Sequence, residues 1–292
     1  MYAATRDEML KFTGEKDPWA ALKFLDAEGV EIHVDRELKT VTFPGNAGKP
    51  YALAEASGRK ALAESLKKEG RRCCALLMAN DFSNPNLDAE ITWAVGAVRA
   101  AKEIGAPAVR IDVVPHQKNT DLDWFLRRAI HGLTEVLKAT EDTGIALGIE
   151  NHGHHTNDPA FLQKLFDGVG SERLGLTLDN GNFYWYGHPL SDVYKLFEKL
   201  APRARHTHIK NIKYPAETRE TKREVGWKYG DYVSAIDEGD IDVRRFAKIL
   251  GSAGYQGALT LEDESIYTRP EAERAASLKR QIAFLKACAA GK

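Results

Sequence analysis

The sequence has few cysteines, no excess of charge of one sign and no long apolar run. Its three cysteines, Cys73, Cys74 and Cys288, lack the spacing of a metal-binding motif, which favours a reduced, cytoplasmic setting. The net charge of −1 at pH 7 gives no bulk attraction to nucleic acid or to an anionic membrane. The longest apolar run, residues 73–79, is too short to cross a bilayer, and residues 1–10 lack the basic and apolar stretches of a signal peptide. We therefore expect no membrane and no nucleic-acid partner.

Glycine-rich phosphate-binding motifs are absent too. Neither a GxGxxG turn nor a P-loop occurs, which argues against an open, doubly wound sheet. Strand and helix patterns alternate eight times without a break in composition, as is typical of a parallel α/β fold. The strands pair an aliphatic face with a small or polar one, as expected when one face meets helices and the other a barrel lumen. We predict a (β/α)8 TIM barrel that forms a single domain over residues 1–292.

Three segments of the chain have a distinctive local composition. Residues 39–49 are rich in glycine, proline and asparagine and are predicted to form a loop, whereas residues 108–116 are predicted to form a strand. Residues 212–240 are unusually long for a strand-to-helix connection and include Trp227 and Tyr229. A connection of that length is usually functional or disordered. We interpret it as a lid whose aromatic side chains cover a substrate.

Four consecutive predicted strands each carry a metal-binding type of side chain near their C-terminal end. In the first, aliphatic residues alternate with Ala146, Gly148 and Glu150, so that one face is aliphatic and the other is small and ends in a carboxylate. Three later segments repeat this arrangement. The four residues concerned are Glu150, Asp179, His208 and Glu262.

The charges of these four residues suggest a metal ion. In a TIM barrel the C-terminal ends of all strands converge on one mouth, where the active site lies. Three carboxylates gathered there would repel one another, and at least one would stay protonated unless a cation compensated their charge. An oxygen-rich set with one imidazole suits Mn²⁺, Mg²⁺ or Co²⁺ in roughly octahedral geometry. We predict that Glu150, Asp179, His208 and Glu262 bind one divalent metal ion, Mn²⁺ before Mg²⁺, Co²⁺ or Zn²⁺.

The motifs around these residues resemble those of the xylose isomerase-like TIM barrels, the sugar-phosphate isomerase/epimerase superfamily. The matching segments are GIENHG, LTLDNGNF, HTHIKN and GYQGALTLEDE, and the resemblance is densest over residues 108–264. It implies that the matching positions, Glu150, Asp179, His208 and Glu262, bind one divalent metal. It also implies that the two glutamates flank the sugar carbon, as in the ketose epimerases of the family. A homo-oligomer, dimer or tetramer, is a further implication.

The chemistry expected of such a site is proton transfer on a carbohydrate. A metal chelated by a ketose carbonyl and its neighbouring hydroxyl acidifies the adjacent C–H by stabilising the enediolate. Glu150 and Glu262 then act as base and conjugate acid. We expect a metal-dependent sugar isomerase or epimerase acting on a ketose or keto-sugar. A lyase of the same fold stays open, namely an inosose or dehydroshikimate dehydratase or a deglycosidase subunit for an oxidised glycoside or C-glycoside, because elimination shares the intermediate. A non-catalytic carbohydrate-binding subunit is the third alternative.

Several neighbouring residues are candidates for supporting roles. Those predicted to bind substrate are His116, His152, Asn182 and Lys210. Lys210 shares the face of His208, where it can contact substrate, stabilise an oxyanion or pair with a ligand carboxylate. Some family members carry a histidine where this chain has Asn182, so the resemblance argues against the multi-zinc apurinic endonucleases. Arg110 is predicted to form a structural ion pair, and His206 to support His208 rather than bind metal. Aromatic walls with few charges favour a neutral sugar over a phosphate.

Overall fold

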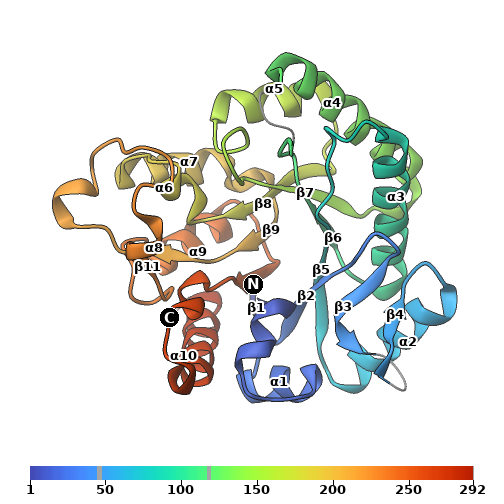
Figure 1. Ribbon diagram of the computed structural model, residues 1–292, viewed down its shortest axis with the longest axis horizontal. Helices are drawn as coiled ribbons and strands as arrows, with labels where there is room; N and C mark the ends of the chain where they lie inside the picture. Colours follow the sequence, from blue (N-terminus) through green and yellow to red (C-terminus); the bar gives the residue numbers. More distant parts are fainter. Residues whose placement is uncertain (45–47, 117–119, 292) are drawn as a thin grey trace. The chain divides into compact units, whose positions relative to one another are not determined.

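The computed structural model describes residues 1–44, 48–116 and 120–291, and its largest sheet has eight strands (Figure 1). The strands pair in the order β12-β1-β2-β5-β6-β7-β8-β9, and an isolated parallel bridge, Ile209↔Leu261, links the residue after β9 to β12. Their bounds are β1 Tyr2–Arg6, β2 Gly29–His33, β5 Arg72–Leu77, β6 Ala108–Ile111, β7 Ala146–Glu150, β8 Leu174–Asp179, β9 Ala204–His208 and β12 Ala258–Leu261. Eight parallel strands that alternate with helices in this order confirm the predicted (β/α)8 TIM barrel.

The chain divides into two compact units. One comprises Met1–Glu31 and Leu178–Lys292, and the other comprises Ile32–Thr177. We refer to them as the terminal unit and the central unit and describe each by itself. The single domain over residues 1–292 stays a prediction.

In the terminal unit, helices pack against the first and last strands of the chain. The long helix α10 packs along β1 and β12, and α7 packs against α9 (Figure 1). Asp17 and Asp242 accept hydrogen bonds from the first-turn N–H groups of α1 and α9, which satisfies donors that a helix start leaves unpaired. The helices are η1 Asp7–Phe12, α1 Pro18–Leu25, α6 Asn182–Trp185, α7 Leu190–Leu200, η4 Ala201–Arg203, η5 Ala216–Thr218, α8 Tyr229–Tyr232, α9 Val243–Ser252, η6 Glu264–Tyr267 and α10 Glu271–Ala289.

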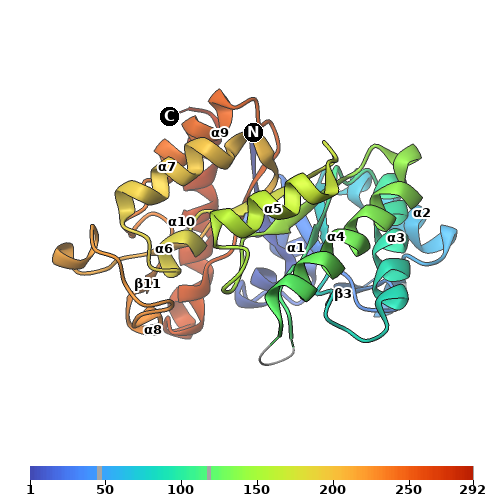
Figure 2. The same ribbon diagram turned by 90° about the horizontal axis from the view of Figure 1, so that it is seen from above.

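In the central unit, α3, α4 and α5 follow one another along the outer side of β5, β6 and β7 (Figures 1 and 2). Their apolar stripes face the strands, and Phe125, Ala129 and Leu133 of α4 are fully buried at helical spacing. Asp158 caps α5 by accepting a hydrogen bond from the N–H of Ala160, and Pro159 takes the first helical position. The helices are α2 Ala56–Lys68, α3 Leu87–Ile104, α4 Leu122–Ala139, η3 Glu141–Thr143 and α5 Pro159–Val169.

Two predictions of local structure were wrong. Residues 39–49 are not simply a loop, because β3 (Lys39–Pro44) pairs in antiparallel fashion with β4 (Pro50–Ala52); residues 45–47 lie outside the described chain. Thr40 joins the two strands, since its hydroxyl donates to the Phe43 carbonyl and accepts from the Tyr51 N–H. The strand predicted over residues 108–116 ends at Ile111. Beyond it, the side chain of Asn80 takes up both backbone hydrogen-bonding groups of Asp112 and so ends the ladder.

The segment 212–240 has structure of its own. Strand β10 (Asn211–Ile212) pairs with β11 (Val233–Ser234), and the side chain of Asn211 donates to the carbonyls of Ile236 and Ile241, both at 2.9 Å. The rings of Tyr214, Trp227 and Tyr232 lie 5.6–5.7 Å apart, centroid to centroid. These aromatic residues therefore pack on one another, and together with the β10–β11 pair they give the segment an ordered structure of its own. Its role as a lid stays a prediction.

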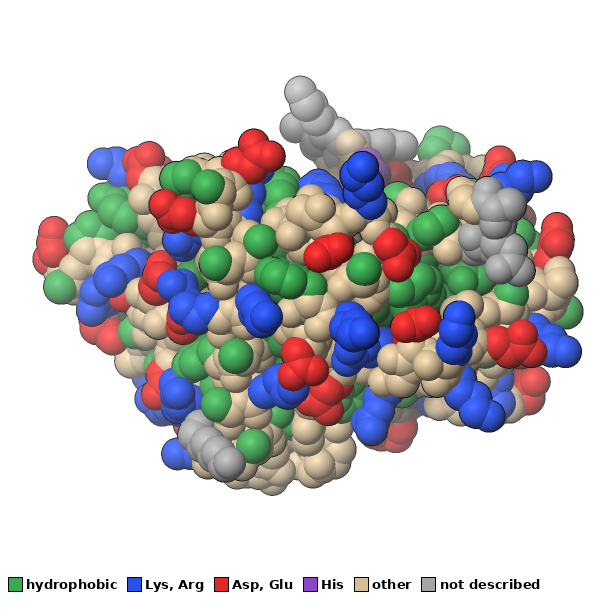
Figure 3. All heavy atoms as spheres, turned by 90° about the horizontal axis from the view of Figure 1, so that it is seen from below, with side chains coloured by type: hydrophobic (Ala, Val, Ile, Leu, Met, Phe, Trp, Pro, Cys, Tyr) green, Lys and Arg blue, Asp and Glu red, His purple; other side chains and the backbone are tan. Residues whose placement is uncertain are grey.

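The face seen in Figure 3 carries no large field of one sign. Acidic and basic side chains are interspersed over it, in keeping with the net charge of −1. Among the described residues, no helix combines the length and apolar character that crossing a membrane requires.

Candidate metal centre

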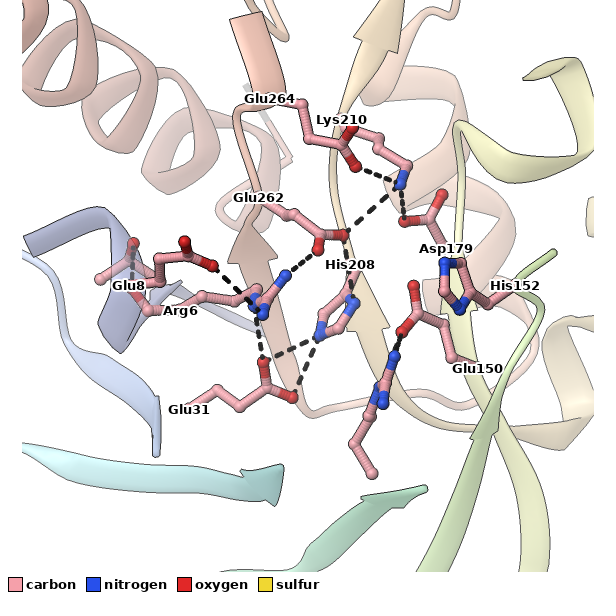
Figure 4. Close-up of polar contacts among 12 residues, drawn as sticks. Arg6, Glu8, Glu31, Glu150, His152, Asp179, His208, Lys210, Glu262 and Glu264 are labelled. Carbon is pink, nitrogen blue, oxygen red and sulfur yellow. Dashed lines mark hydrogen bonds and ion pairs between the residues drawn. The ribbon is translucent and has the colours of Figure 1, made fainter. Parts of the chain in front are cut away.

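Three of the four predicted metal ligands lie together in the terminal unit. Asp179 is the last residue of β8, His208 is the last of β9, and Glu262 directly follows β12. All three side chains are buried, and each offers one ligand atom within 4.8 Å of those of the others (Figure 4). Because the C-terminal ends of parallel strands meet at one edge, the sequence alternation brings these residues to one place.

His208 stands between two carboxylates. Its Nε2 forms hydrogen bonds of 2.9 and 3.0 Å with the two oxygens of Glu31, and its Nδ1 lies 3.2 Å from Oε2 of Glu262 (Figure 4). A neutral imidazole carries one N–H. Whichever nitrogen holds that proton, the lone pair of the other faces a carboxylate. The ring nitrogen that lacks the N–H therefore needs a cation between it and the carboxylate, either a second proton or a metal ion.

Two basic side chains already contribute positive charge. Lys210 Nζ lies 3.3 Å from Asp179 Oδ2, 3.7 Å from Glu262 Oε2 and 2.7 Å from Glu264 Oε1, and Arg6 forms an ion pair with Glu262 Oε1. Burial alone would raise the pKa of Glu262, but the charges of Lys210, His208 and Arg6 outweigh it and hold that pKa well below its usual range. Glu262 is consequently a carboxylate at neutral pH.

Lys210 remains charged despite its burial. Removal from water would lower the pKa of its ammonium, but the nearby carboxylates of Asp179, Glu262 and Glu264 raise it well above its usual value. One of the roles predicted for Lys210 was a salt bridge to a metal-binding carboxylate, and the structure contains such salt bridges to Asp179 and Glu262. Its contact with substrate stays a prediction.

Glu31 is a component that the sequence reasoning missed. It lies on β2 in register with Arg6 of β1, is fully buried, and contacts His206 Nε2 at 3.0 Å as well as His208. Burial would raise the pKa of Glu31, yet the charges of His208 and His206 lower it well below the usual range. The available signal was a carboxylate between two aliphatic residues, Val30 and Ile32, in the strand GVEIH. His206, as predicted, lies beside His208 in a supporting position.

Glu150, the fourth predicted ligand, belongs to the central unit. It is the buried last residue of β7 and lies in register with Thr177 of β8. Nε of Arg110 donates to Glu150 Oε2 at 2.7 Å, and Nη1 of Arg110 donates to Asp112 Oδ2 at 2.6 Å. The ion pair predicted for Arg110 is therefore present with both carboxylates.

The remaining candidates occupy different surroundings. In the central unit, the side chain of His116 is 57% exposed with Nδ1 3.7 Å from Asp81 Oδ2, and that of His152 is 50% exposed with Nδ1 3.5 Å from Asp112 Oδ1. The hydrogen bond to Asp112 raises the pKa of His152. In the terminal unit, Asn182 is buried at the start of α6, and its backbone N–H donates to Asp179 Oδ1 at 2.7 Å. Their contacts with substrate stay predictions.

Comparison with known proteins identifies the family of the chain. A family model described as xylose isomerase-like TIM barrel matches residues 19–288 of the chain. The protein belongs to this family. The resemblance noted in the four strand-end motifs is thereby confirmed, and it extends over nearly the whole sequence.

The proteins to which the chain is similar carry names of different activities. Inosose dehydratases of Yersinia enterocolitica and Bacillus thuringiensis are 27% and 26% identical over 150 and 160 residues, which cover 50% and 52% of this chain and 49% and 52% of theirs. The chain thus spans about half the length of the curated relatives it matches. Among solved structures, a zinc-bound IolI protein has a TM-score of 0.72 at 16% identity, covering 98% of each chain. The 3-keto-D-glucoside 4-epimerase YcjR of E. coli has a TM-score of 0.67 at 14% identity, covering 99% of this chain and 100% of that one.

The donor set in the terminal unit fits a divalent metal ion. Asp179 and Glu262 supply carboxylate oxygens, and His208 supplies a ring nitrogen whose Nδ1 side already faces Glu262. Oxygen donors with one imidazole suit a hard or borderline divalent ion. The donor set is compatible with Mn²⁺, Mg²⁺, Co²⁺ or Zn²⁺, and the preference for Mn²⁺ stays a prediction.

Proposed function

We propose that this xylose isomerase-like protein is a metal-dependent isomerase or epimerase of a ketose or keto-sugar, which acts by proton transfer through an enediolate. The observation that carries the proposal is His208 between Glu31 and Glu262, an arrangement in which a divalent metal ion can take the place of a second proton on the imidazole. The family relationship supports the same conclusion.

The proposed metal ligands are Asp179, His208, Glu262 and Glu150. The strand register supports the inclusion of Glu150, which is paired with Thr177 of β8, the strand that ends at Asp179. A divalent ion in this set would polarise a substrate carbonyl and stabilise negative charge on its oxygen.

Glu262 and Glu150 are the proposed acid–base pair. Because its pKa is held well below the usual range, Glu262 begins the reaction as a carboxylate and can accept a proton from the carbon next to the carbonyl. Lys210, a buried ammonium, supplies positive charge near the oxygen on which negative charge develops. Glu262 then holds the abstracted proton. In epimerisation a protonated Glu150 donates a different proton to the same carbon from the opposite face. In isomerisation the abstracted proton is returned to the neighbouring carbon, while the hydroxyl proton passes to the former carbonyl oxygen.

The substrate is proposed to be uncharged. The ammonium of Lys210 is already paired with Asp179, Glu262 and Glu264, so an anionic group would meet these carboxylates rather than an open positive charge. Tyr229 of the segment 212–240 donates a hydrogen bond to Glu264 at 2.8 Å, so this lid-like segment contacts the same carboxylate that pairs with Lys210. A neutral sugar suits these surroundings better than a sugar phosphate.

Dehydration is the second candidate reaction. The curated relatives support it, since five of them are inosose dehydratases. Loss of a hydroxyl group from the carbon beyond the carbanion starts from the same proton abstraction. The protein would then act on a keto-cyclitol or a related keto-sugar.

The first experiment is a screen of keto-sugars and inososes in D₂O with Mn²⁺, followed by NMR and ultraviolet absorbance. Deuterium entering the carbon next to the carbonyl with no new absorbance supports isomerisation or epimerisation, whereas an unsaturated product that absorbs in the ultraviolet supports dehydration. Glu150→Gln should abolish exchange while the protein stays folded. Binding of sugar with no exchange under any metal would contradict an enzymatic role and favour a binding subunit. Assembly into a dimer or tetramer and a cytoplasmic location stay predictions.

A further inference from the structure

A buried carboxylate outside the proposed ligand set holds the ring of His208. Both oxygens of Glu31 lie within 3.0 Å of His208 Nε2, although β2 and β9 are not neighbours in the sheet. The contact is therefore made by the side chains alone and is not a by-product of strand pairing. Because the two residues are 177 positions apart in the chain, only the fold brings them together.

Glu31 is itself fixed in place. His206 Nε2 lies 3.0 Å from its Oε1, and Arg6 Nε lies 3.6 Å from its Oε2. Arg6 also pairs with Glu262, the carboxylate on the other side of His208. Arg6 and His206 thus hold Glu31 in one orientation behind the imidazole, with its charge directed at Nε2.

We propose that Glu31 is a positioning residue that prepares His208 to bind the metal ion. By accepting the Nε2–H, Glu31 selects one tautomer and leaves the Nδ1 lone pair directed toward Glu262, where the ion is proposed to bind. A carboxylate in this relation to a ligand histidine fixes the ring and makes it a stronger donor. The inference rests on the proposed metal site, and it assigns a role to a residue that lies outside the ligand set.

The test compares Glu31→Gln with the wild type by titrating metal-free protein with Mn²⁺ and measuring the dissociation constant calorimetrically. The amide keeps the shape and an acceptor but removes the charge, and loss of such a partner typically weakens metal binding by about 10–100-fold. Glu90→Gln is the matched control, since Glu90 is an equally buried glutamate of the central unit that pairs with Arg36. It should bind Mn²⁺ as the wild type does.

A second measurement needs no variant of Glu31. Nitrogen-15 NMR of the histidine side chains, assigned with His208→Gln, should show His208 protonated at Nε2 in the Mg²⁺-loaded protein. Protonation at Nδ1 would overturn the inference, as would equal Mn²⁺ affinity in Glu31→Gln and the wild type. A merely structural role would lower the melting temperature of the metal-free protein without changing the increment that Mn²⁺ adds.

The stoichiometry separates this inference from its alternatives. Glu31, His206 and His208 also offer ligand atoms within 4.8 Å of one another, so two ions per chain would identify Glu31 as a ligand and overturn a positioning role. One ion per chain, bound more weakly in Glu31→Gln, supports the inference. A wild type that binds no ion at all would remove the proposed function itself, whereas normal binding by Glu31→Gln removes only the role of Glu31.

Discussion

The two units hold their buried carboxylates in different ways. In the central unit one arginine, Arg110, donates to both Glu150 and Asp112 through separate nitrogens. In the terminal unit one lysine, Lys210, lies 2.7–3.7 Å from three carboxylates. A guanidinium presents donors in a rigid planar fork, whereas an ammonium is a compact charge on a flexible stem.

The difference separates carboxylates whose directions are fixed from carboxylates that cluster around a single ammonium. The fork of Arg110 fixes the directions of Glu150 and Asp112 through defined hydrogen bonds. Around Lys210 three carboxylates share one ammonium, Arg6 also pairs with Glu262, and Nδ1 of His208 lies 3.2 Å from Glu262. Such an arrangement suits a place where a second cation binds. Substitution of either cation tests the contrast, and the largest effect is expected in the central unit.

Removal of Arg110 should reduce stability most. In Arg110→Met, Glu150 and Asp112 become buried carboxylates without their main cation, which should cost about 3–5 kcal/mol in the free energy of unfolding. Chemical denaturation measures this. The matched control is Arg99→Met in the same unit, where the ion pair to Asp142 is exposed and its loss should cost less than about 1 kcal/mol. Equal costs in the two variants would contradict a structural role for Arg110.

Removal of Lys210 should impair catalysis more than folding. Lys210→Met removes the positive charge near the developing oxyanion, and kcat should fall about 10²–10³-fold, as for the loss of an oxyanion donor. The fold should persist, because Asp179 keeps the N–H donors of Gly181 and Asn182. Initial rates and far-ultraviolet circular dichroism check both points. Lys195→Met, an exposed lysine paired with Asp192, is the control and should leave kcat unchanged. An unchanged kcat in Lys210→Met would remove the proposed role.

The sequence alone predicted the strand-end residues of the site but not the carboxylate that contacts Nε2 of His208. Alternating small and aliphatic residues were sufficient to predict that Asp179, His208 and Glu262 stand at strand ends, because side-chain direction along a strand is a local property. The same alternation predicted the eight strands of the barrel. It could not find Glu31, since His208, the residue whose ring it contacts, lies 177 positions away in the chain.

The sequence pattern mispredicted secondary structure at two places where a polar side chain forms hydrogen bonds with the backbone. The strand β6 was predicted to reach residue 116, but Asn80 takes the hydrogen bonds that would continue it beyond Ile111. The hairpin of β3 and β4 was missed because its Pro44 and Pro50 read as loop residues, whereas Thr40 joins the two strands through its hydroxyl. In both cases one polar side chain decides the outcome, and composition does not reveal its partner.

Removal of the metal should have an intermediate effect. If an ion binds the folded protein alone, a concentration 100 times the dissociation constant adds about 2.7 kcal/mol to stability, so chelation should lower the melting temperature by several degrees. Thermal melts with and without a chelator measure the difference. In His208→Gln one ligand is lost, while Glu31 keeps His206 and Arg6, and chelation should produce a much smaller change. The same drop in the wild type and in His208→Gln would contradict the terminal-unit site.

The smallest effect concerns pH and the histidines. His206 and His208 of the terminal unit are buried, whereas His152 of the central unit is half-exposed and its pKa is raised from 6.5 by Asp112. A group whose pKa is raised by folding stabilises the folded state fully at pH values below its unfolded pKa. That contribution is lost as the pH rises through the folded pKa. His152→Gln should therefore melt below the wild type at pH 6, and the gap should close as the pH rises above 6.5 into the mildly alkaline range. A gap that stayed constant from pH 6 to pH 9 would show that His152 acts by packing, and that Asp112 relies on Arg110 alone.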